Sequence, residues 1–355
     1  MTPTNFLEWS DCDLPVTDGS YHVIWDTAAD GVEIFSKSAS VVAELKYRPV
    51  TEANADYMIV DLSGGASATG YPVKYVRGVD PKTFNRNVYK TTKLVLKRVT
   101  AATFMMGDAS DNNSKPVHEV TLTKDFFLGL FELTRYQYSQ VISSYTTKTM
   151  FPLTGITWNT LATGSTGFFA LLSAKSQYKG APVPAFDFPT DAQWERACRA
   201  DTTTTYFWGA GTADLGLYTW YENNGWLSAV GLKLPNPFGF YDITGNVFEM
   251  CKDWMNPYTA DPATDPVADT AAPGVEAKST RGGSYRWAIN TFAKSGVRRG
   301  EKPGGWASYG GDYVGVRVSA RSITPAPVCP LRRRPRRKPR RLPLCSTRVR
   351  TPCAS

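Results

Sequence analysis

Between residues 100 and 320, apolar and aromatic residues occur in short runs separated by long glycine-rich loops, and few positions can start a helix. Two of those positions are capping boxes, in which Thr134 is followed by Gln137, and Thr190 by Gln193, three residues later. In a capping box the two side chains satisfy free backbone amides at the start of a helix. The pattern predicts an α+β fold with few, short helices joined by strands and irregular loops.

The expected helices carry apolar positions that fit a buried core. In the helix after the second capping box, Trp194, Ala197 and Cys198 recur at helical spacing, and a third helix is expected around Phe168 and Leu172. The chain is 42% hydrophobic and 20% charged, so most of it can fold around a core and disorder is excluded for that part. We therefore expect these aromatic residues to be core residues.

The N-terminal quarter of the chain has a different pattern. Residues 20–98 contain strand-like runs, with Asp30 and Gly31 as a hairpin signal and with alternating apolar residues around Leu94. This pattern predicts a separate β-rich module over residues 1–90, Ig-like or sandwich-like. The polar run Gly78–Lys90 is the expected hinge, so the main domain is expected to cover residues 91–320.

The positive charge of the chain is concentrated at its C-terminal end. Residues 321–355 hold 11 of the 40 basic residues and no acidic residue, which leaves 29 basic against 32 acidic residues in the body. This Arg/Pro-rich stretch cannot bury a core and is predicted to be a disordered tail. It would bind nucleic acid or an anionic surface non-specifically, or it is a read-through extension. No specific nucleic-acid partner is expected, because the body has no basic stripe.

The sequence does not settle where the protein works. No run is long and apolar enough to span a bilayer, so no transmembrane segment is expected. The N-terminus lacks the basic segment and apolar core of a signal peptide. Both the cell surface and the cytoplasm stay open as locations.

The chain offers few ligands for a transition metal. Its six cysteines include no CxxC pair and three of them lie in the tail, and its two histidines, His22 and His118, are far apart in the sequence. Zinc ribbons, imidazole-rich metal centres and most catalytic triads therefore lack the residues they need. Cys198 and Cys251 are expected to be small buried apolar residues.

Seven short segments of the main domain follow one another in a recognisable order. They are FMMGD (Phe104–Asp108), PVHEVTLTKDFFLGLFELTRYQY (Pro116–Tyr138), FPTDAQWERACRA (Phe188–Ala200), YFWG (Tyr206–Gly209), LPNPFGFYDITGNVFEMCKDW (Leu234–Trp254), RGGSY (Arg281–Tyr285) and YVGVR (Tyr313–Arg317). Together they resemble the formylglycine-generating enzyme, or sulfatase-modifying factor, family. The resemblance implies an irregular variant of the C-type lectin-like fold.

The resemblance also allows the catalytic residues of the family to be sought. Its oxidases bind copper through two cysteine thiolates, five positions apart, that follow the GGS motif. The corresponding positions here are Trp287 and Phe292, and no cysteine occurs between Cys251 and Cys329. Soft copper requires thiolate or thioether donors, so no copper is expected, and the sequence favours a domain that is not an enzyme.

The resemblance implies a calcium site in the segment YDITGNVFEM. Carboxylate and carbonyl oxygens are the hard donors that calcium prefers. Alternatively, Asp242 and Glu249 pair with Arg281 or Lys252 and hold the loop without a metal. The implied calcium ligands are Asp242, Gly245, Val247 and Glu249.

A further branch of this fold, the variable proteins of diversity-generating retroelements, uses the segment that begins at the GGS motif as a ligand-binding face. In this chain that segment is residues 281–317. Rigid aromatic and arginine side chains are typical of binding surfaces. Alternatively, Trp287 and Trp306 are core residues; Arg298 and Arg317 are expected to belong to the scaffold. The residues expected on the face are Arg286, Trp287, Asn290, Arg299, Trp306, Tyr309, Asp312 and Tyr313.

These observations favour a non-catalytic binding protein that displays residues 281–317 on a lectin-like scaffold. Its expected partner is a protein or a cell-surface ligand, and the face is a candidate for retroelement diversification. Two alternatives stay open: an oxidase that acts on protein cysteine, which the missing cysteine pair disfavours, and a structural spacer.

Overall fold

The chain forms two compact units, Met1–Pro49 and Val50–Ser355. The structure, a computed structural model, describes residues 6–8, 24–25, 50–222, 226–287, 289–305 and 311–321. In the first unit the described residues form an antiparallel pair, β1 (Phe6–Glu8) and β2 (Ile24–Trp25). The predicted hairpin at Asp30 and Gly31 and the predicted disordered tail lie outside the described residues, so both stay predictions.

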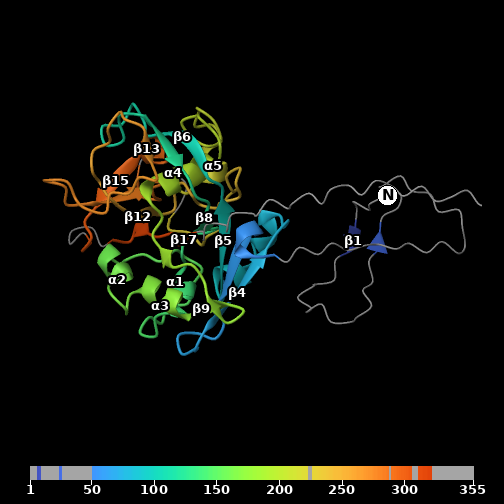
Figure 1. The fold of residues 1–355 in the computed structure, drawn as a ribbon. Helices are drawn as coiled ribbons and strands as arrows, with labels where there is room; N and C mark the ends of the chain where they lie inside the picture. The colour runs from blue at the N-terminus through green and yellow to red at the C-terminus, as the bar shows by residue number, and fades with distance from the viewer. Residues whose placement is uncertain are drawn as a thin grey trace, which may run out of the picture. The chain divides into compact units, whose positions relative to one another are not determined.

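The second unit contains an eight-stranded sheet (Figure 1). Its strand order is β10-β9-β4-β3-β5-β8-β17-β11, and every neighbouring pair is antiparallel except β4 with β9. In this spatial order the strands are β10 (Ala181–Pro182), β9 (Ser176–Tyr178), β4 (Tyr71–Val76), β3 (Tyr57–Asp61), β5 (Lys93–Val99), β8 (Phe126–Gly129), β17 (Ser319–Arg321) and β11 (Phe186–Asp187).

This sheet corrects the predicted domain boundary near residue 90. Strand β3 pairs with β4 on one side and with β5 on the other, so residues on both sides of position 90 belong to one sheet. We had not predicted β4, although Tyr71, Val73 and Tyr75 alternate with exposed residues as in a half-buried strand. The expected hinge instead forms two short 3₁₀ turns, η2 (Pro81–Phe84) and η3 (Asn87–Lys90). The sandwich-like character of residues 1–49 stays a prediction.

The other strands described in the second unit form two smaller sheets. One is four-stranded and has the order β15-β14-β12-β16, and the other is three-stranded and has the order β13-β7-β6. The strands of the first are β15 (Arg298–Glu301), β14 (Lys278–Arg281), β12 (Phe248–Trp254) and β16 (Val314–Gly315). The strands of the second are β13 (Ala263–Thr264), β7 (His118–Leu122) and β6 (Ala102–Met106).

The helices are few and short, as predicted, and both predicted capping boxes are present. The Thr134 hydroxyl accepts from the Gln137 amide at 3.1 Å, and the Gln137 side chain accepts from the Thr134 amide at 3.1 Å. Thr190 and Gln193 form the same pair of hydrogen bonds, at 3.1 and 3.0 Å. The helices are α1 (Arg135–Ser139), α2 (Trp158–Ala162), α3 (Phe168–Lys175), α4 (Asp191–Arg199), α5 (Leu215–Tyr218) and α6 (Ile289–Phe292), and η1 (Glu52–Asn54) is a further 3₁₀ turn.

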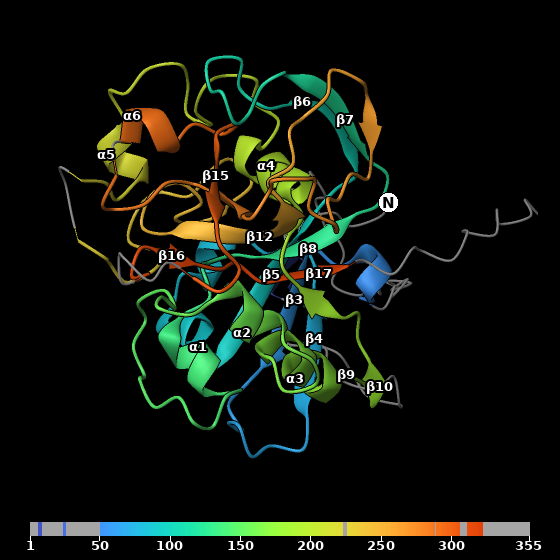
Figure 2. The same cartoon turned by 90° about the vertical axis from the view of Figure 1, so that its left-hand side faces the viewer.

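The large sheet has a separate hydrophobic core on each face, because successive residues of a strand point to opposite faces. Met58 of β3 packs into the core that includes Phe168 of α3, whereas Ile59 packs into the core that includes Trp194 of α4. Figure 2 shows α1, α2 and α3 together on one side and α4 on the other. In the part of the chain that the structure describes, no helix combines the length and apolarity needed to cross a membrane.

Candidate functional site

The expected ligand face is carried by the four-stranded sheet, whose two faces differ in chemistry. Across this sheet Arg299 lies opposite Thr280, and Arg281 lies opposite both Arg298 and Glu249. Because side chains alternate along a strand, Arg299 and Thr280 point to one face, and Arg298, Arg281 and Glu249 point to the other. The first face forms a cavity and the second packs against α4.

The first face is the floor of a cavity of about 220 Å³. Its walls include the rings of Trp287 and Tyr313, which lie edge-to-face with centroids 6.1 Å apart, and Phe292 packs against the Trp287 ring from outside the lining at 5.9 Å. The Arg299 guanidinium lies 4.4 Å from the Phe292 centroid and 5.6 Å from the Trp287 centroid. The residues that line the cavity are Phe248, Thr280, Trp287, Arg299, Gly300, Glu301, Tyr313 and Val314.

The second face is held by buried ion pairs. The Nε and Nη2 atoms of Arg317 donate to the carboxylate oxygens of Glu249 at 2.6–3.1 Å. The Trp194 indole donates to the same carboxylate at 2.7 Å. Arg281 pairs with Asp191 and lies 2.9 Å from Glu195. The expectation that Arg317 belongs to the scaffold is confirmed, since its side chain is fully buried.

Arg298, the other arginine expected in the scaffold, also lies on this second face. It is buried and lies 3.3 Å from Asp191, beside Arg281. Burial by itself would raise the pKa of Asp191, but Arg281 and Arg298 outweigh burial and hold this pKa below its ordinary value. The expectation for Arg298 is therefore confirmed, and Asp191 is the carboxylate that ties both arginines to α4.

The residues predicted on the ligand face take different positions. Arg286 and Asp312 form an ion pair of 2.7 Å in which each side chain is about half exposed. Trp287 is half-buried, and Arg299 is half-buried beside it. Tyr313 is only 8% exposed, so it is a cavity wall and not an open surface residue, because Phe248 and Trp287 pack against its ring. Trp306, Tyr309 and the side chain of Asn290 lie outside the described residues.

Sequence reasoning missed five of the cavity residues, namely Gly300, Val314, Phe248, Thr280 and Glu301, and the last three contribute side chains of a kind that could contact a ligand. These three lie on β12, β14 and β15, and none of the quoted motifs assigns them a role. The available signal was the period of two along each strand: Glu301 follows Arg299 by two positions and therefore lies on the same face. That signal becomes useful only when the pairing of the strands is known.

The residues around the cavity do not fit a copper ion. Trp287 and Phe292, which stand where the family's oxidases have cysteines, supply aromatic rings and no sulfur donor. Cys198 and Cys251 are buried free thiols, and burial raises the pKa of Cys198 to about 12 and that of Cys251 well above its ordinary value. Neither is therefore a thiolate near neutral pH, which is the form that binds copper.

The two carboxylates among the predicted calcium ligands contact protein groups. Both oxygens of Glu249 accept from Arg317, which is neither of the two partners we had considered for it. One oxygen of Asp242 accepts from the Gly231 amide at 2.5 Å, and the other has no partner. No group of three or more His, Cys, Asp or Glu side chains that could hold a metal occurs among the described residues. The predicted site relies on two carboxylates and two main-chain carbonyls, so calcium at this loop stays a prediction.

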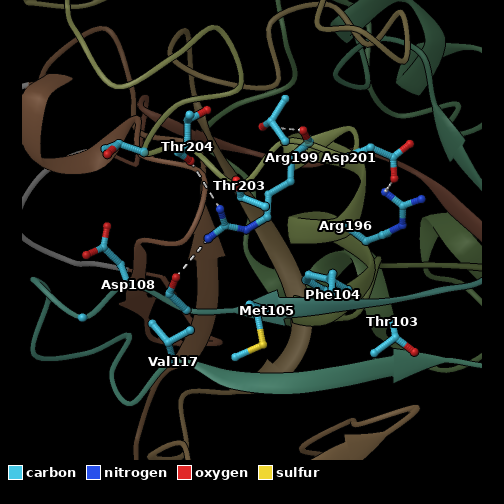
Figure 3. A pocket seen from close by; sticks show the side chains of 14 residues that line it. Thr103, Phe104, Met105, Asp108, Val117, Arg196, Arg199, Asp201, Thr203 and Thr204 are labelled. Atoms are coloured by element: carbon cyan, nitrogen blue, oxygen red, sulfur yellow. Dashed lines mark hydrogen bonds and ion pairs between the residues drawn. The ribbon is translucent and has the colours of Figure 1, made fainter.

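A second cavity, of about 590 Å³, lies between β6 and the segment after α4 (Figure 3). Its two arginines are already paired: Arg196 lies 2.8 Å from Asp201, and Arg199 lies 2.8 Å from Glu195. Arg199 also donates to the Gly107 carbonyl at 2.9 Å. The cavity thus offers no free arginine charge to select a ligand. It was not predicted, and its only sequence signal is the run of four threonines at positions 202–205.

Three comparisons with known proteins bear on this geometry. The model of the sulfatase-modifying factor enzyme 1-like domain matches residues 79–322. The formylglycine-generating enzyme of Streptomyces coelicolor is 34% identical over 114 residues, which cover 27% of this chain and 35% of that enzyme. The enzyme of the same name from Mycobacterium tuberculosis is 35% identical over 117 residues, which cover 27% of this chain and 39% of the relative. The aligned stretch thus spans little more than a third of either relative.

Two solved structures share the fold. Treponema denticola variable protein 1 superimposes with a TM-score of 0.54 at 23% identity, over 65% of this chain and 96% of that chain. PvdO from Pseudomonas aeruginosa superimposes with a TM-score of 0.52 at 19% identity, over 64% and 94%. These likenesses confirm the predicted α+β, C-type lectin-like fold. The family model matches more than half of the chain, so the chain belongs to the sulfatase-modifying factor enzyme 1-like domain family.

Proposed function

We propose that this chain is a non-catalytic binding protein that recognises a protein or cell-surface ligand through the segment 281–317. One observation carries the proposal: the positions of the family's copper-binding cysteines hold two aromatic rings, Trp287, which lines a cavity together with Arg299, and Phe292, which packs behind both of them. Such a site lacks thiolates but offers aromatic and arginine contacts, which dominate the energetics of binding interfaces.

The scaffold around the segment supports the proposal. Arg281 at its start and Arg317 at its end are fully buried in ion pairs with Asp191 and Glu249. Between these anchors lie half-exposed residues such as Arg286 and Asp312. Rigid ends with accessible residues between them allow the accessible positions to change with little loss of stability.

Single alanine substitutions test the proposal. Trp287→Ala and Arg286→Ala should abolish capture of a specific partner from the host's envelope fraction, measured by quantitative mass spectrometry. Arg77→Ala, at an exposed arginine near the end of β4, is the matched control and should capture the same partner. Urea unfolding of each variant must show that the fold survives. Equal capture by all three variants would contradict the proposal.

We further propose that codons 281–317 are diversified by a retroelement. The likeness to Treponema denticola variable protein 1 supports the common fold alone, so the evidence has to come from the DNA. A near-copy of these codons should lie close to the gene and differ from it only where the copy has adenine. Absence of any such copy would end this part of the proposal and leave ligand binding untouched.

An oxidase acting on protein cysteine is the competing function, because two relatives are named formylglycine-generating enzyme. The donors around the cavity do not favour it. Incubation of the protein with copper(I) and a cysteine peptide of the sulfatase type should give no aldehyde by mass spectrometry. Turnover above that of a protein-free blank would replace the binding proposal with the oxidase.

A further inference from the structure

The arginines of segment 281–317 differ in whether a carboxylate neutralises them. Four of the five are paired with an acidic side chain, whereas no ion pair or hydrogen bond joins the Arg299 guanidinium to any described residue. The four pairs are Arg281 with Asp191 and Glu195, Arg286 with Asp312, Arg298 with Asp191, and Arg317 with Glu249.

The described residues around Arg299 hold its side chain, but none of them accepts a hydrogen bond from its guanidinium. Its guanidinium lies over the rings of Phe292 and Trp287, at 4.4 and 5.6 Å from their centroids. A guanidinium held over aromatic rings contacts them without using its N–H groups as conventional hydrogen-bond donors, so these donors stay available to a ligand. Two parallel N–H donors match the two oxygens of a carboxylate.

The size of the cavity limits what can reach this guanidinium. Its volume of about 220 Å³ lies below the roughly 300–1,000 Å³ that is typical of sites for whole small molecules. Its walls include the rings of Phe248, Trp287 and Tyr313, whose low polarity strengthens a charge-charge contact beside them. A cavity of this kind fits one side chain of a larger partner.

A second charged residue also affects which ligand group can enter the cavity. Glu301 lines the same cavity two residues beyond Arg299 on β15. Its negative charge repels any anionic group that enters, whereas Arg299 attracts such a group, so the ligand group has to reach the guanidinium itself. The anionic side chains of an unmodified protein are the carboxylates of aspartate and glutamate.

We infer that this cavity receives one aspartate or glutamate side chain of a protein ligand, whose carboxylate accepts two hydrogen bonds from Arg299. The inference rests on the proposed function and names the chemistry that this face selects. In the bound state Arg299 would gain the carboxylate partner that the other four arginines already have, and the aliphatic part of the acidic side chain would lie against Trp287 and Tyr313.

The test uses the full chain labelled with ¹⁵N-tryptophan and three probes. The probes are N-acetyl-glutamate α-amide, its neutral analogue N-acetyl-glutamine amide, and inorganic phosphate. The indole resonance of Trp287, assigned with Trp287→Phe, should shift with the glutamate probe and with neither of the others. Arg299→Gln should abolish the shift, and Arg299→Lys, which keeps the charge but loses the planar fork, should weaken binding about tenfold. Arg77→Gln should bind as the unmodified protein does.

Other outcomes would overturn the inference. Equal shifts with the glutamine probe would mean that no charge is recognised, and tighter binding of phosphate would mean a general anion site. A glutamate response that survives Arg299→Gln would place the contact elsewhere. If none of the probes shifts the resonance while Trp287→Ala still abolishes partner capture, the proposed function stands and the inference about the acidic side chain fails.

Discussion

Glu249 and Arg317 join more parts of the domain than any other pair described above. The Arg317 guanidinium donates to Glu249, to the Gly129 carbonyl at 3.0 Å and to the Tyr241 carbonyl at 2.9 Å. The Trp194 indole completes the group from α4. The guanidinium thus connects β8, β12 and the loop before β12, and the Glu249 carboxylate adds α4. Because both side chains are fully buried, replacing either charge leaves the other without its hydrogen-bonded partner.

Glu249→Gln should therefore destabilise the domain strongly. Removing one partner of a buried ion pair costs about 3–5 kcal/mol, because the remaining charge stays in a medium of low polarity. Urea unfolding followed by circular dichroism would measure the loss. Arg286→Gln, which breaks the half-exposed pair with Asp312, is the control and should cost less than about 1 kcal/mol. Equal losses in the two variants would show that Glu249 is not the linking residue.

Asp242 should make stability depend on pH. Burial raises its pKa to about 6, although the Gly231 amide, Arg317 and Lys90 act in the opposite direction. An unfolded aspartate has a pKa of about 3.9. Between this pH and the folded pKa, the folded state binds more protons than the unfolded state, so the free energy of unfolding falls as the pH rises through this range. Asp242→Asn removes this loss. The stability of the variant relative to the unmodified protein should rise from about pH 4 to pH 6 and then level off. A difference that does not change with pH, measured by urea unfolding, would contradict the assignment.

At the scale of elements, the sequence predicted features that depend on residues close together in the chain, and it failed for contacts between distant residues. The capping boxes at Thr134 and Thr190 were correct because the cap and its partner are three residues apart in the chain. The predicted partner of Glu249 was wrong. Arg317 lies 68 residues after Glu249 in the sequence, and the pairing of β16 with β12 brings the two residues together. The two-faced character of the four-stranded sheet likewise depends on register between distant strands.

The loop that leads into β12 should be insensitive to calcium. Both oxygens of Glu249 already accept from Arg317 and one oxygen of Asp242 accepts from the Gly231 amide, so calcium would have to displace these contacts. Excess calcium chloride or EDTA should leave the melting temperature unchanged in differential scanning fluorimetry. A native state that binds calcium would gain about 2.7 kcal/mol at 100 times the dissociation constant. A calcium-dependent rise in melting temperature that Asp242→Asn removes would restore the predicted site.

At the scale of the whole molecule, the order of seven motifs was sufficient to predict the fold of the main domain but not where that domain begins. The motifs start at Phe104, whereas the sheet that supports them already includes β3 and β4. The short polar run before residue 90 suggested a hinge, but Phe84 within it is buried against the Tyr57 ring at 4.6 Å. Composition could not reveal this contact, since the two residues are 27 positions apart.

The structure therefore predicts which shortened chains can fold. A chain of residues 50–321 keeps every strand of the large sheet and should unfold cooperatively, with a melting temperature close to that of the full chain. A chain of residues 91–321 loses β3 and β4, which leaves the edge of β5 unpaired and exposes Leu94 and Leu96. An exposed apolar edge strand promotes aggregation, so this shorter chain should aggregate or melt without a cooperative transition. Size-exclusion chromatography and circular dichroism melting would compare the two. If the 91–321 chain is monomeric and unfolds cooperatively, the boundary near residue 90 is supported instead. That result would show that the rest of the large sheet is stable without β3 and β4.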